Sequence, residues 1–329
     1  MYREFYNLTC NPFELSPDPF FFFPTQRHNE ALALLNYGVL RRKGFVVVTG
    51  EVGTGKTLLV RCLLDSLTRQ KVAFAYLYNP LLTVQNFLEQ VLADLGLPVG
   101  SRSKNEALSR LNNYLLTRSR DGLTTALIVD EAQLLSWELL EEVRLLTNLE
   151  TTQHKLLQIV LAGQPELDRK LDSHQLRQLK QRVGLRCNLL PLELGEVAGY
   201  IHRRLELAGA KDTAKAIFAR EAIDAIFLFS RGVPRLVNTL CENALMLGFG
   251  LQQKQITGAI IREVAADFRL ETPAPSPRNG NNAPAVIPEH SDHGPTMGLK
   301  LLHRKAKDDV TLSSANTLQK SFYPGEKSE

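Results

Sequence analysis

A glycine-rich octapeptide carries the clearest chemical pattern in this 329-residue chain. It has the form G-x-x-x-x-G-K-[ST] and consists of Gly50, Glu51, Val52, Gly53, Thr54, Gly55, Lys56 and Thr57. In such a loop, backbone N–H groups at a helix N-terminus bind phosphate oxygens. The lysine reaches the β- and γ-phosphates, and the hydroxyl binds Mg²⁺. The pattern therefore predicts a binding site for a nucleoside triphosphate and Mg²⁺.

The residues on either side of this loop have the patterns that the chemistry requires. Residues 45–49 are apolar and largely β-branched, which predicts a buried strand, and residues 58–64 carry apolar side chains at helical spacing. An accidental match on a glycine-rich turn would not require this context. The strand–loop–helix order therefore favours a phosphate-binding loop (Walker A).

Two carboxylates follow a second buried strand. Residues 125–129 are apolar, and Asp130 and Glu131 come directly after them. Asp130 would hold Mg²⁺ directly or through water, and Glu131 would orient and deprotonate the attacking water. An acidic helix N-cap would show the same residues. The phosphate-binding loop upstream favours the catalytic interpretation (Walker B).

A polar side chain ends a further apolar strand. Residues 156–162 predict this strand, and Gln164 follows it after one glycine. If the strand lies between the other two, its polar end lies beside the γ-phosphate. Gln164 is therefore a candidate sensor of the nucleotide state.

The remaining pattern predicts an α/β fold with a three-layer αβα core, a C-terminal all-helical lid and a disordered tail. Further strands are expected at 72–78 and 187–190, and core helices at 26–42, 83–95, 104–120 and 136–150. The lid is expected to contain helices at 193–207, 220–230, 234–249 and 258–270. We divide the chain into an aromatic and proline-rich segment with a helix packing on the core (1–43), the core (44–190), the lid (191–270) and the tail (271–329). The aromatic segment could also form an apolar wall for an adenine ring.

Composition restricts the class of protein without choosing one. The chain is 44% hydrophobic and 22% charged, with a net charge of +4, which is too modest to argue for nucleic acid. Its four cysteines lack C-x-x-C spacing and are expected to be reduced thiols. No signal peptide and no apolar stretch long enough to span a bilayer is present. These features predict a cytoplasmic protein.

Several nucleotide-binding classes share both motifs, and the rest of the sequence separates them. An L-S-G-G-Q-like stretch of transporter ATPases, a second RecA-like core of helicases and an N-K-x-D motif of GTPases are all missing. An α/β core of about 150 residues that precedes a small helical lid remains. This order indicates an AAA+ ATPase.

The chain resembles the general secretion pathway protein A (ExeA-like) family of AAA+ ATPases over about residues 1–270. The resemblance rests on the two motifs above and on the stretches 11–13, 17–19, 28–32, 161–167, 181–183, 200–205 and 232–235. MSHA-pilus and exosortase-associated ATPases look similar. The resemblance implies Mg²⁺-dependent ATP hydrolysis by a homo-oligomeric ring that acts on a protein partner.

The resemblance also implies roles for residues outside the two motifs. Gln164 would be sensor 1. Arg235, at the start of a lid helix, would be sensor 2 and reach the γ-phosphate, although an exposed arginine at a helix start would look the same. Asn79, at the end of the second strand, could hydrogen-bond Glu131 and hold it inactive.

An arginine finger is expected to enter the neighbouring subunit's site and stabilise transition-state charge. Arg182 is our expected finger, with Arg186 and Arg177 as substitutes.

One departure from the family bears on function. Secretion-pathway members typically continue into a transmembrane helix and a periplasmic peptidoglycan-binding domain, whereas this chain ends in a polar tail. We therefore expect a cytoplasmic ATPase that assists assembly of a secretion, pilus or polysaccharide-export apparatus, with recruitment to the inner membrane by a partner left open. Two alternatives stay open: a DNA-directed ATPase of the transposition-regulator type, and a nucleotide-binding scaffold without turnover.

Overall fold

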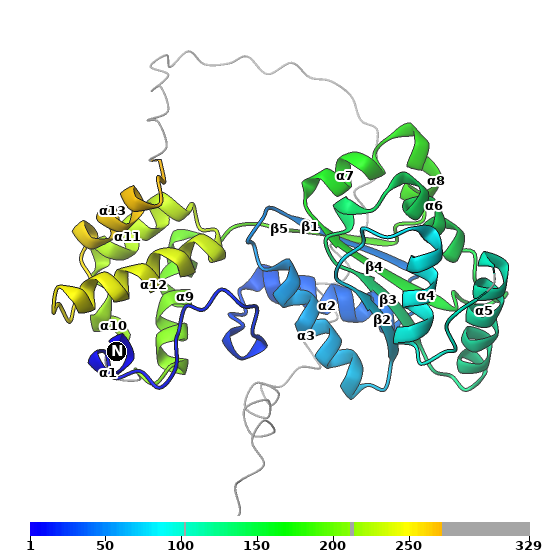
Figure 1. Ribbon diagram of the computed structural model, residues 1–329, viewed down its shortest axis with the longest axis horizontal. Helices are drawn as coiled ribbons and strands as arrows, with labels where there is room; N and C mark the ends of the chain where they lie inside the picture. The colour runs from blue at the N-terminus through cyan, green and yellow to red at the C-terminus, as the bar shows by residue number, and fades with distance from the viewer. Residues whose placement is uncertain (102, 211–213, 272–329) are drawn as a thin grey trace, which may run out of the picture. The chain divides into compact units, whose positions relative to one another are not determined.

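A five-stranded parallel sheet organises the chain in the computed structural model, which describes residues 1–101, 103–210 and 214–271 (Figure 1). The strands are β1 (Phe45–Gly50), β2 (Ala73–Leu77), β3 (Thr125–Val129), β4 (Leu157–Gly163) and β5 (Leu185–Leu189). Their order is β2-β3-β4-β1-β5, and every pair is parallel. Strand β4 therefore lies between β3 and β1, as the argument for Gln164 requires. Parallel strands share one carboxyl edge, so Gly50, Val129 and Gly163 end side by side.

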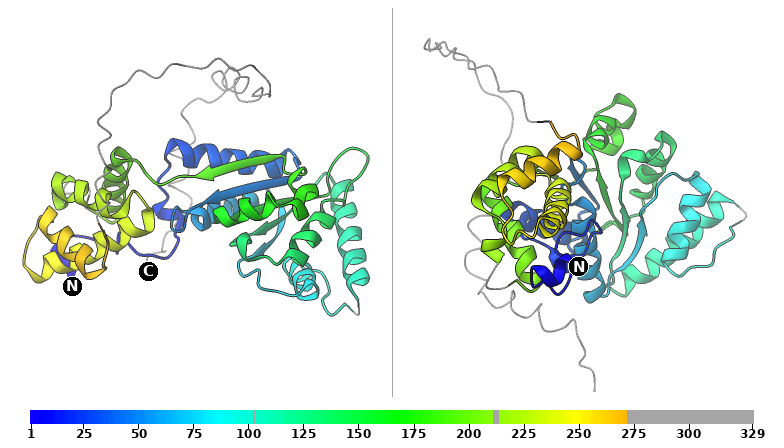
Figure 2. Two further views of the ribbon diagram at one scale, coloured as in Figure 1. Left: turned by 90° about the horizontal axis from the view of Figure 1, so that it is seen from above. Right: turned by 60° about the vertical axis from the view of Figure 1, so that its left-hand side comes forward.

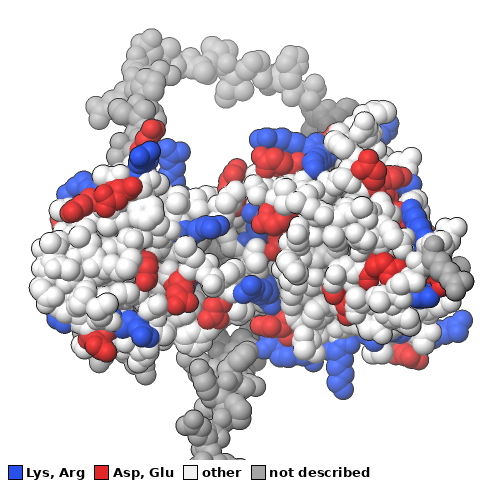
Figure 3. Space-filling model, viewed as in Figure 1, with Lys and Arg blue, Asp and Glu red and all other residues white. Residues whose placement is uncertain are grey.

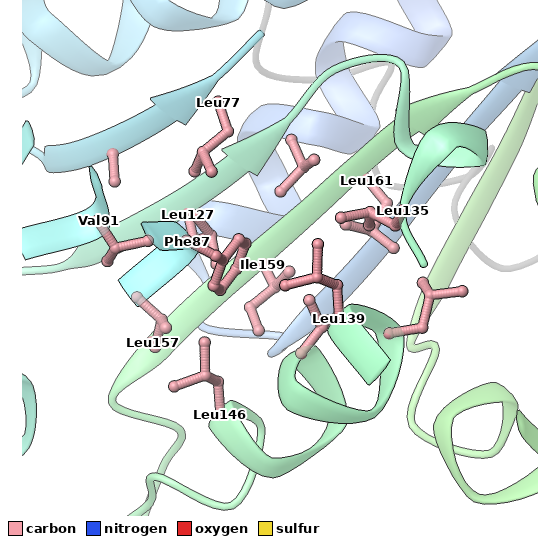
Figure 4. Packing of buried hydrophobic residues seen from close by; sticks show 14 of the residues in the cluster. Leu77, Phe87, Val91, Leu127, Leu135, Leu139, Leu146, Leu157, Ile159 and Leu161 are labelled. Carbon is pink, nitrogen blue, oxygen red and sulfur yellow. The ribbon is translucent and has the colours of Figure 1, made fainter. Parts of the chain in front are cut away.

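Helices cover both faces of the sheet. Helices α2 (Gln26–Leu40) and α3 (Lys56–Arg69) pack on one face, where Val46 and Val48 point. The other face, with Phe45 and Val47, is covered by α4 (Val84–Asp94), α5 (Lys104–Arg120), α6 (Trp137–Leu146), α7 (Pro165–Leu171) and α8 (Arg177–Lys180). The left view of Figure 2 shows the two helical layers, and Figure 4 shows the leucine-rich packing under α4 and α6. The predicted three-layer αβα core is confirmed.

The all-helical lid follows the sheet. It consists of α9 (Leu194–Leu207), α10 (Ala214–Ile217), α11 (Arg220–Ser230), α12 (Pro234–Gly250) and α13 (Gly258–Asp267). Four of these were predicted, and the short α10 was not. In the core, α6 ends at Leu146, four residues before its predicted end, and Glu150 pairs with Lys155 in an isolated antiparallel bridge.

The first residues of the N-terminal segment pack with the lid. Tyr6, Leu8 and Phe13 are buried in the same hydrophobic cluster as the lid helices, and α1 (Tyr2–Phe5) lies against α12. The buried Arg204 of α9 donates to the Pro12 carbonyl, which ties the segment to the lid. Later parts of the region contact the core: Phe22 packs against the cluster on the α2–α3 face of the sheet, Arg61 of α3 donates to the Pro17 carbonyl, and α2 packs on the sheet.

The structure bears only in part on two predictions, the disordered tail and the lack of a membrane-spanning stretch. The predicted disordered tail, apart from Glu271, lies outside the described residues. Within the described part of the chain, no helix is both long and apolar enough to cross a membrane.

Candidate nucleotide-binding site

The glycine-rich loop connects β1 to α3 at the carboxyl edge of the sheet. Gly53 and Gly55 have positive φ angles of 80° and 99°, and Gly55 is the N-cap of α3. A Cβ atom at Gly53 would lie 2.8 Å from Cβ of Arg235, so glycine is also needed there for space. The Thr54 hydroxyl donates to the Glu51 carbonyl at 2.8 Å, which closes the turn. The loop thus has the conformation that exposes backbone N–H groups at a helix N-terminus.

The ammonium of Lys56 lies over this loop. Its Nζ donates to the carbonyls of Gly50 and Glu51 at 2.8 and 2.9 Å. Burial lowers the pKa of Lys56, and the carboxylates of Glu131 and Asp130 oppose this effect. Among the described residues, the acceptors of these bonds are neutral carbonyls, so the buried ammonium favours an anion in the loop.

The two Walker motifs meet at one hydrogen bond. The Thr57 hydroxyl, at the start of α3, donates to Oδ2 of Asp130 at 2.8 Å, and Oδ1 of Asp130 accepts the Glu131 N–H at 2.9 Å. Burial raises the pKa of Asp130, while the Thr57 bond opposes the rise. A hydroxyl and a carboxylate are hard oxygen donors that suit Mg²⁺, which usually keeps waters and phosphate oxygens as its other ligands. Among the described residues no cluster of three or more His, Cys, Asp or Glu could hold a metal by itself.

The Glu131 carboxylate is held by two glutamines. Glu131 has a φ of +50°, in the left-handed region that is uncommon for residues other than glycine. Its Oε2 accepts from Nε2 of Gln133 at 2.5 Å and from Nε2 of Gln164 at 3.3 Å. The Oε1 atom of Gln133 in turn accepts the Gln164 backbone N–H at 2.9 Å. The ends of strands β3 and β4 are therefore joined through Glu131, and the role of Gln164 as a sensor beside the γ-phosphate stays a prediction.

The sequence-predicted arginines lie in different surroundings. The backbone N–H of Arg235 donates to the Gly53 carbonyl at 3.3 Å, so the start of α12 lies on the phosphate-binding loop. Arg182 donates to the Thr147 hydroxyl at 2.7 Å, and Arg186 pairs with Asp168 at 3.0 Å.

Two further predicted residues have no partner at the site. Arg177 is exposed and has no recorded side-chain partner in the described part of the chain. The side chain of Asn79 accepts from Leu81 N–H at 3.3 Å, within its own turn, and the recorded bonds to Glu131 come from the glutamines.

Sequence reasoning missed three side chains around this site. Gln133 stands inside the Asp-Glu-Ala-Gln stretch but received no role. His28, at the start of α2, is 3.7 Å from the position of a Cβ at Gly55, and burial lowers its pKa. Burial, together with Asp130, raises the pKa of Tyr76 to about 12. Tyr76 lies one residue before the end of β2, a position that could have indicated it, but nothing local in the sequence indicates His28.

Comparison with known proteins agrees with this geometry. Residues 40–171 match a family model described as an AAA domain. The match includes both motifs and Gln164 but ends before Arg182 and Arg235. General secretion pathway protein A of Aeromonas hydrophila is 43% identical over 250 residues, which make up 76% of this chain. The aligned part is 45% of that relative, so the chain spans less than half of its length.

Two solved structures show the same fold at low sequence identity. The Cdc6p protein of Pyrobaculum aerophilum is 19% identical, with a TM-score of 0.59 over 77% of this chain and 70% of that one. The ORC2 protein of Aeropyrum pernix, determined as ADPNP–ADP complexes, is 16% identical, with a TM-score of 0.56 over 75% of this chain and 70% of that one.

Proposed function

Because the chain belongs to the general secretion pathway protein A family of AAA+ ATPases, we propose that it hydrolyses ATP with Mg²⁺ and couples hydrolysis to assembly or regulation of a secretion, pilus or polysaccharide-export apparatus. The observation that carries the proposal is the 2.8 Å bond between Thr57 and Asp130. It brings the hydroxyl of Walker A and the carboxylate of Walker B to one point beside the phosphate-binding loop. The catalytic Glu131 is the next residue along the chain.

Each residue of the site has a task in this proposal. The N–H groups of residues 50–57 bind the phosphates of ATP, and Lys56 exchanges its two carbonyl acceptors for phosphate oxygens. Thr57 and Asp130 would hold Mg²⁺, which when bound neutralises charge on the β- and γ-phosphates. Glu131 accepts a proton from the attacking water, and Gln164 orients Glu131 and contacts the γ-phosphate.

The lid and the neighbouring subunit complete the site in an oligomeric ring. Arg235 serves as sensor 2, because its backbone already lies on the phosphate-binding loop. The finger is one of Arg177, Arg182 and Arg186. Their contacts favour Arg177, since Arg182 and Arg186 would each have to break an existing hydrogen bond or ion pair. Mixing finger variants with Lys56→Met subunits separates the three, because only a true finger acts in trans.

The place of action belongs to the same proposal. We place the chain in the cytoplasm, with recruitment to the inner membrane by a protein partner of the envelope apparatus. The four cysteines are free thiols, which fits a reducing compartment. Fractionation of cells with and without the envelope apparatus tests this placement.

The first experiment compares ATP turnover of the wild type and of Glu131→Gln, with and without DNA, and measures particle mass in ATP. We expect turnover that requires Mg²⁺ and Glu131, does not respond to DNA, and accompanies ATP-dependent oligomers. The same rate in Glu131→Gln would overturn the proposal and favour the scaffold alternative.

The DNA-directed alternative is the second outcome of that experiment. On the face drawn in Figure 3, the described Lys and Arg side chains are interspersed with Asp and Glu and form no continuous basic stripe. Strong stimulation by DNA with a steep salt dependence would nevertheless select this alternative.

A further inference from the structure

We propose that Gln133 is a positioning residue that orients the Glu131 carboxylate and locks it to the end of β4, an inference that rests on the proposed ATPase function. One amide makes both contacts. Its Nε2 donates to Oε2 of Glu131 at 2.5 Å, and its Oε1 accepts the Gln164 N–H at 2.9 Å. The amide therefore bridges the two strand ends that flank the γ-phosphate position.

The surroundings fix Gln133 from both sides. Its side chain is buried, with 8% of the residue exposed, so it acts through Glu131 and not on ATP itself. A Cβ at Gly163 would lie 3.0 Å from Oε1 and 3.2 Å from N of Gln133, which shows how closely β4 approaches. From α7, Nζ of Lys170 donates to the Gln133 carbonyl at 2.5 Å and to the Leu135 carbonyl at 3.0 Å. Main chain and side chain of Gln133 are thus both held.

This arrangement matters because Glu131 alone is poorly constrained. It precedes a single 3₁₀ turn, η2 (Ala132–Leu134), and begins it in the left-handed conformation. Both recorded donors to its side chain, among the described residues, use Oε2. In the proposed mechanism, Oε1 is the oxygen that accepts the proton of the attacking water. When a general base is displaced by about 1 Å from its productive position, the reaction slows on the order of 10²-fold.

Gln158, near the start of β4, provides a matched control. It too is a buried glutamine, and its Oε1 accepts the Gly44 N–H at 2.8 Å while its Nε2 donates to the Lys155 carbonyl at 2.9 Å. It lies near the opposite end of β4, away from Glu131. Replacing it tests the structural cost of losing a buried amide without touching the proposed base.

The experiment measures kcat and KM for Mg²⁺-ATP, binding of a non-hydrolysable ATP analogue, and thermal unfolding. The proteins are full-chain wild type, Glu131→Gln, Gln133→Met, Gln133→Glu and Gln158→Met, all at ~pH 8, where carboxylates are ionised. We expect kcat of Gln133→Met to fall about tenfold or more, with KM and analogue affinity unchanged. Gln158→Met should keep the wild-type kcat even if it unfolds at lower temperature.

Which of the two Gln133 variants has the lower kcat distinguishes a positioning role from a packing role. Glutamate has the shape of glutamine and can still accept the Gln164 N–H. If it is ionised, it faces Glu131 with a like charge and no donor; if the pair shares a proton, Glu131 is no longer a free carboxylate base. Positioning therefore predicts a lower kcat for Gln133→Glu than for Gln133→Met, whereas a purely structural role predicts the reverse. If Gln133→Met does not fold, Gln133→Asn gives the same comparison with a shortened amide.

The outcomes distinguish this inference from the function on which it rests. Wild-type turnover that depends on Glu131, with unchanged kcat in both Gln133 variants, overturns the inference alone. An increased kcat would also overturn it, because Gln133 would then restrain the base. Absence of Glu131-dependent turnover in the wild type overturns the proposed function first.

Discussion

The nucleotide site and the lid are each stabilised by their own contacts, and these contacts differ in how far apart the bonded residues lie in the sequence. At the site, the chemistry comes from the ends of adjacent strands and from the loop that follows each one. Its hydrogen bonds join polar side chains to one another and to the main chain. The lid instead closes around the start of the chain. Tyr2 donates to Glu242 and Tyr6 to the Gln253 carbonyl, across more than 200 residues. The site should therefore respond to substitution mainly in binding and catalysis, and the lid mainly in stability.

Lys56→Met should give the largest effect, and it should concern binding. We expect ATP affinity to fall about 1,000-fold, or about 4 kcal/mol, because the buried cation that attracts the phosphates is gone. Stability without nucleotide should not fall, since burial of this charge is unfavourable, as its lowered pKa indicates. Titration with a fluorescent ATP analogue and thermal unfolding measure the two quantities. Lys43→Met, on the exposed loop before β1, is the control; equal ATP binding by both variants would contradict the expectation.

Arg204→Ala tests whether a substitution in the lid mainly lowers stability. Its guanidinium is buried, with 4% of the residue exposed, donates to the Tyr200 hydroxyl at 2.7 Å, and lies 4.5 Å from the ring centroid of Phe21. Truncation leaves a cavity and removes the bond to the N-terminal segment, so we expect a loss of about 3 kcal/mol in the free energy of unfolding.

A neighbouring arginine controls for that change. Arg203 pairs loosely with Glu206 at 3.8 Å on the surface, and Arg203→Ala should cost no more than about 0.5 kcal/mol. Urea unfolding of both variants measures the difference. Similar losses would mean that the N-terminal segment does not depend on the buried guanidinium.

Gly53→Ala acts where the two regions meet. A methyl group there pays for a positive φ and collides with Cβ of Arg235 at 2.8 Å, so we expect about 2 kcal/mol of lost stability together with weaker ATP binding. Gly96 also has a positive φ, of 72°, but nothing lies within 4 Å of a Cβ there. Gly96→Ala should therefore cost only about 1 kcal/mol. Equal costs in denaturant unfolding would show that the start of α12 does not press on the loop in solution.

Separation along the sequence also explains which features could be predicted from the sequence. The phosphate-binding loop and the Asp130–Glu131 pair are contiguous, and the strand before each is a short apolar run, so both the motifs and the αβα core follow from local patterns. The role of Gln133 could not follow, because it depends on how closely β4 approaches at Gly163. The packing of Tyr6 and Phe13 on the lid also could not follow, since a partner some 200 residues away leaves no mark on local periodicity.

His28 lies beside the phosphate-binding loop, and replacing it should change stability less than Arg204→Ala or Gly53→Ala does. Its Nδ1 lies 2.7 Å from the Thr25 hydroxyl, while its ring lies beside the phosphate-binding loop, and burial holds its pKa below 6.5. Above pH 6.5 the histidine is neutral in the folded and the unfolded chain, and its contribution to stability is complete. As the pH falls below 6.5, the unfolded chain takes up the proton first, so stability declines until the folded histidine is also protonated.

His28→Gln should remove this decline and cost about 1 kcal/mol at ~pH 8 for the altered bond to Thr25. Wild type and variant are compared by urea unfolding across the range from ~pH 5 to ~pH 8, which brackets the ordinary histidine pKa. Their difference should shrink on the acid side, because only the wild type carries a histidine that resists protonation beside the loop. A difference that stays constant with pH would mean that solvent reaches His28 and that the base of the phosphate-binding loop is more open than its contacts indicate.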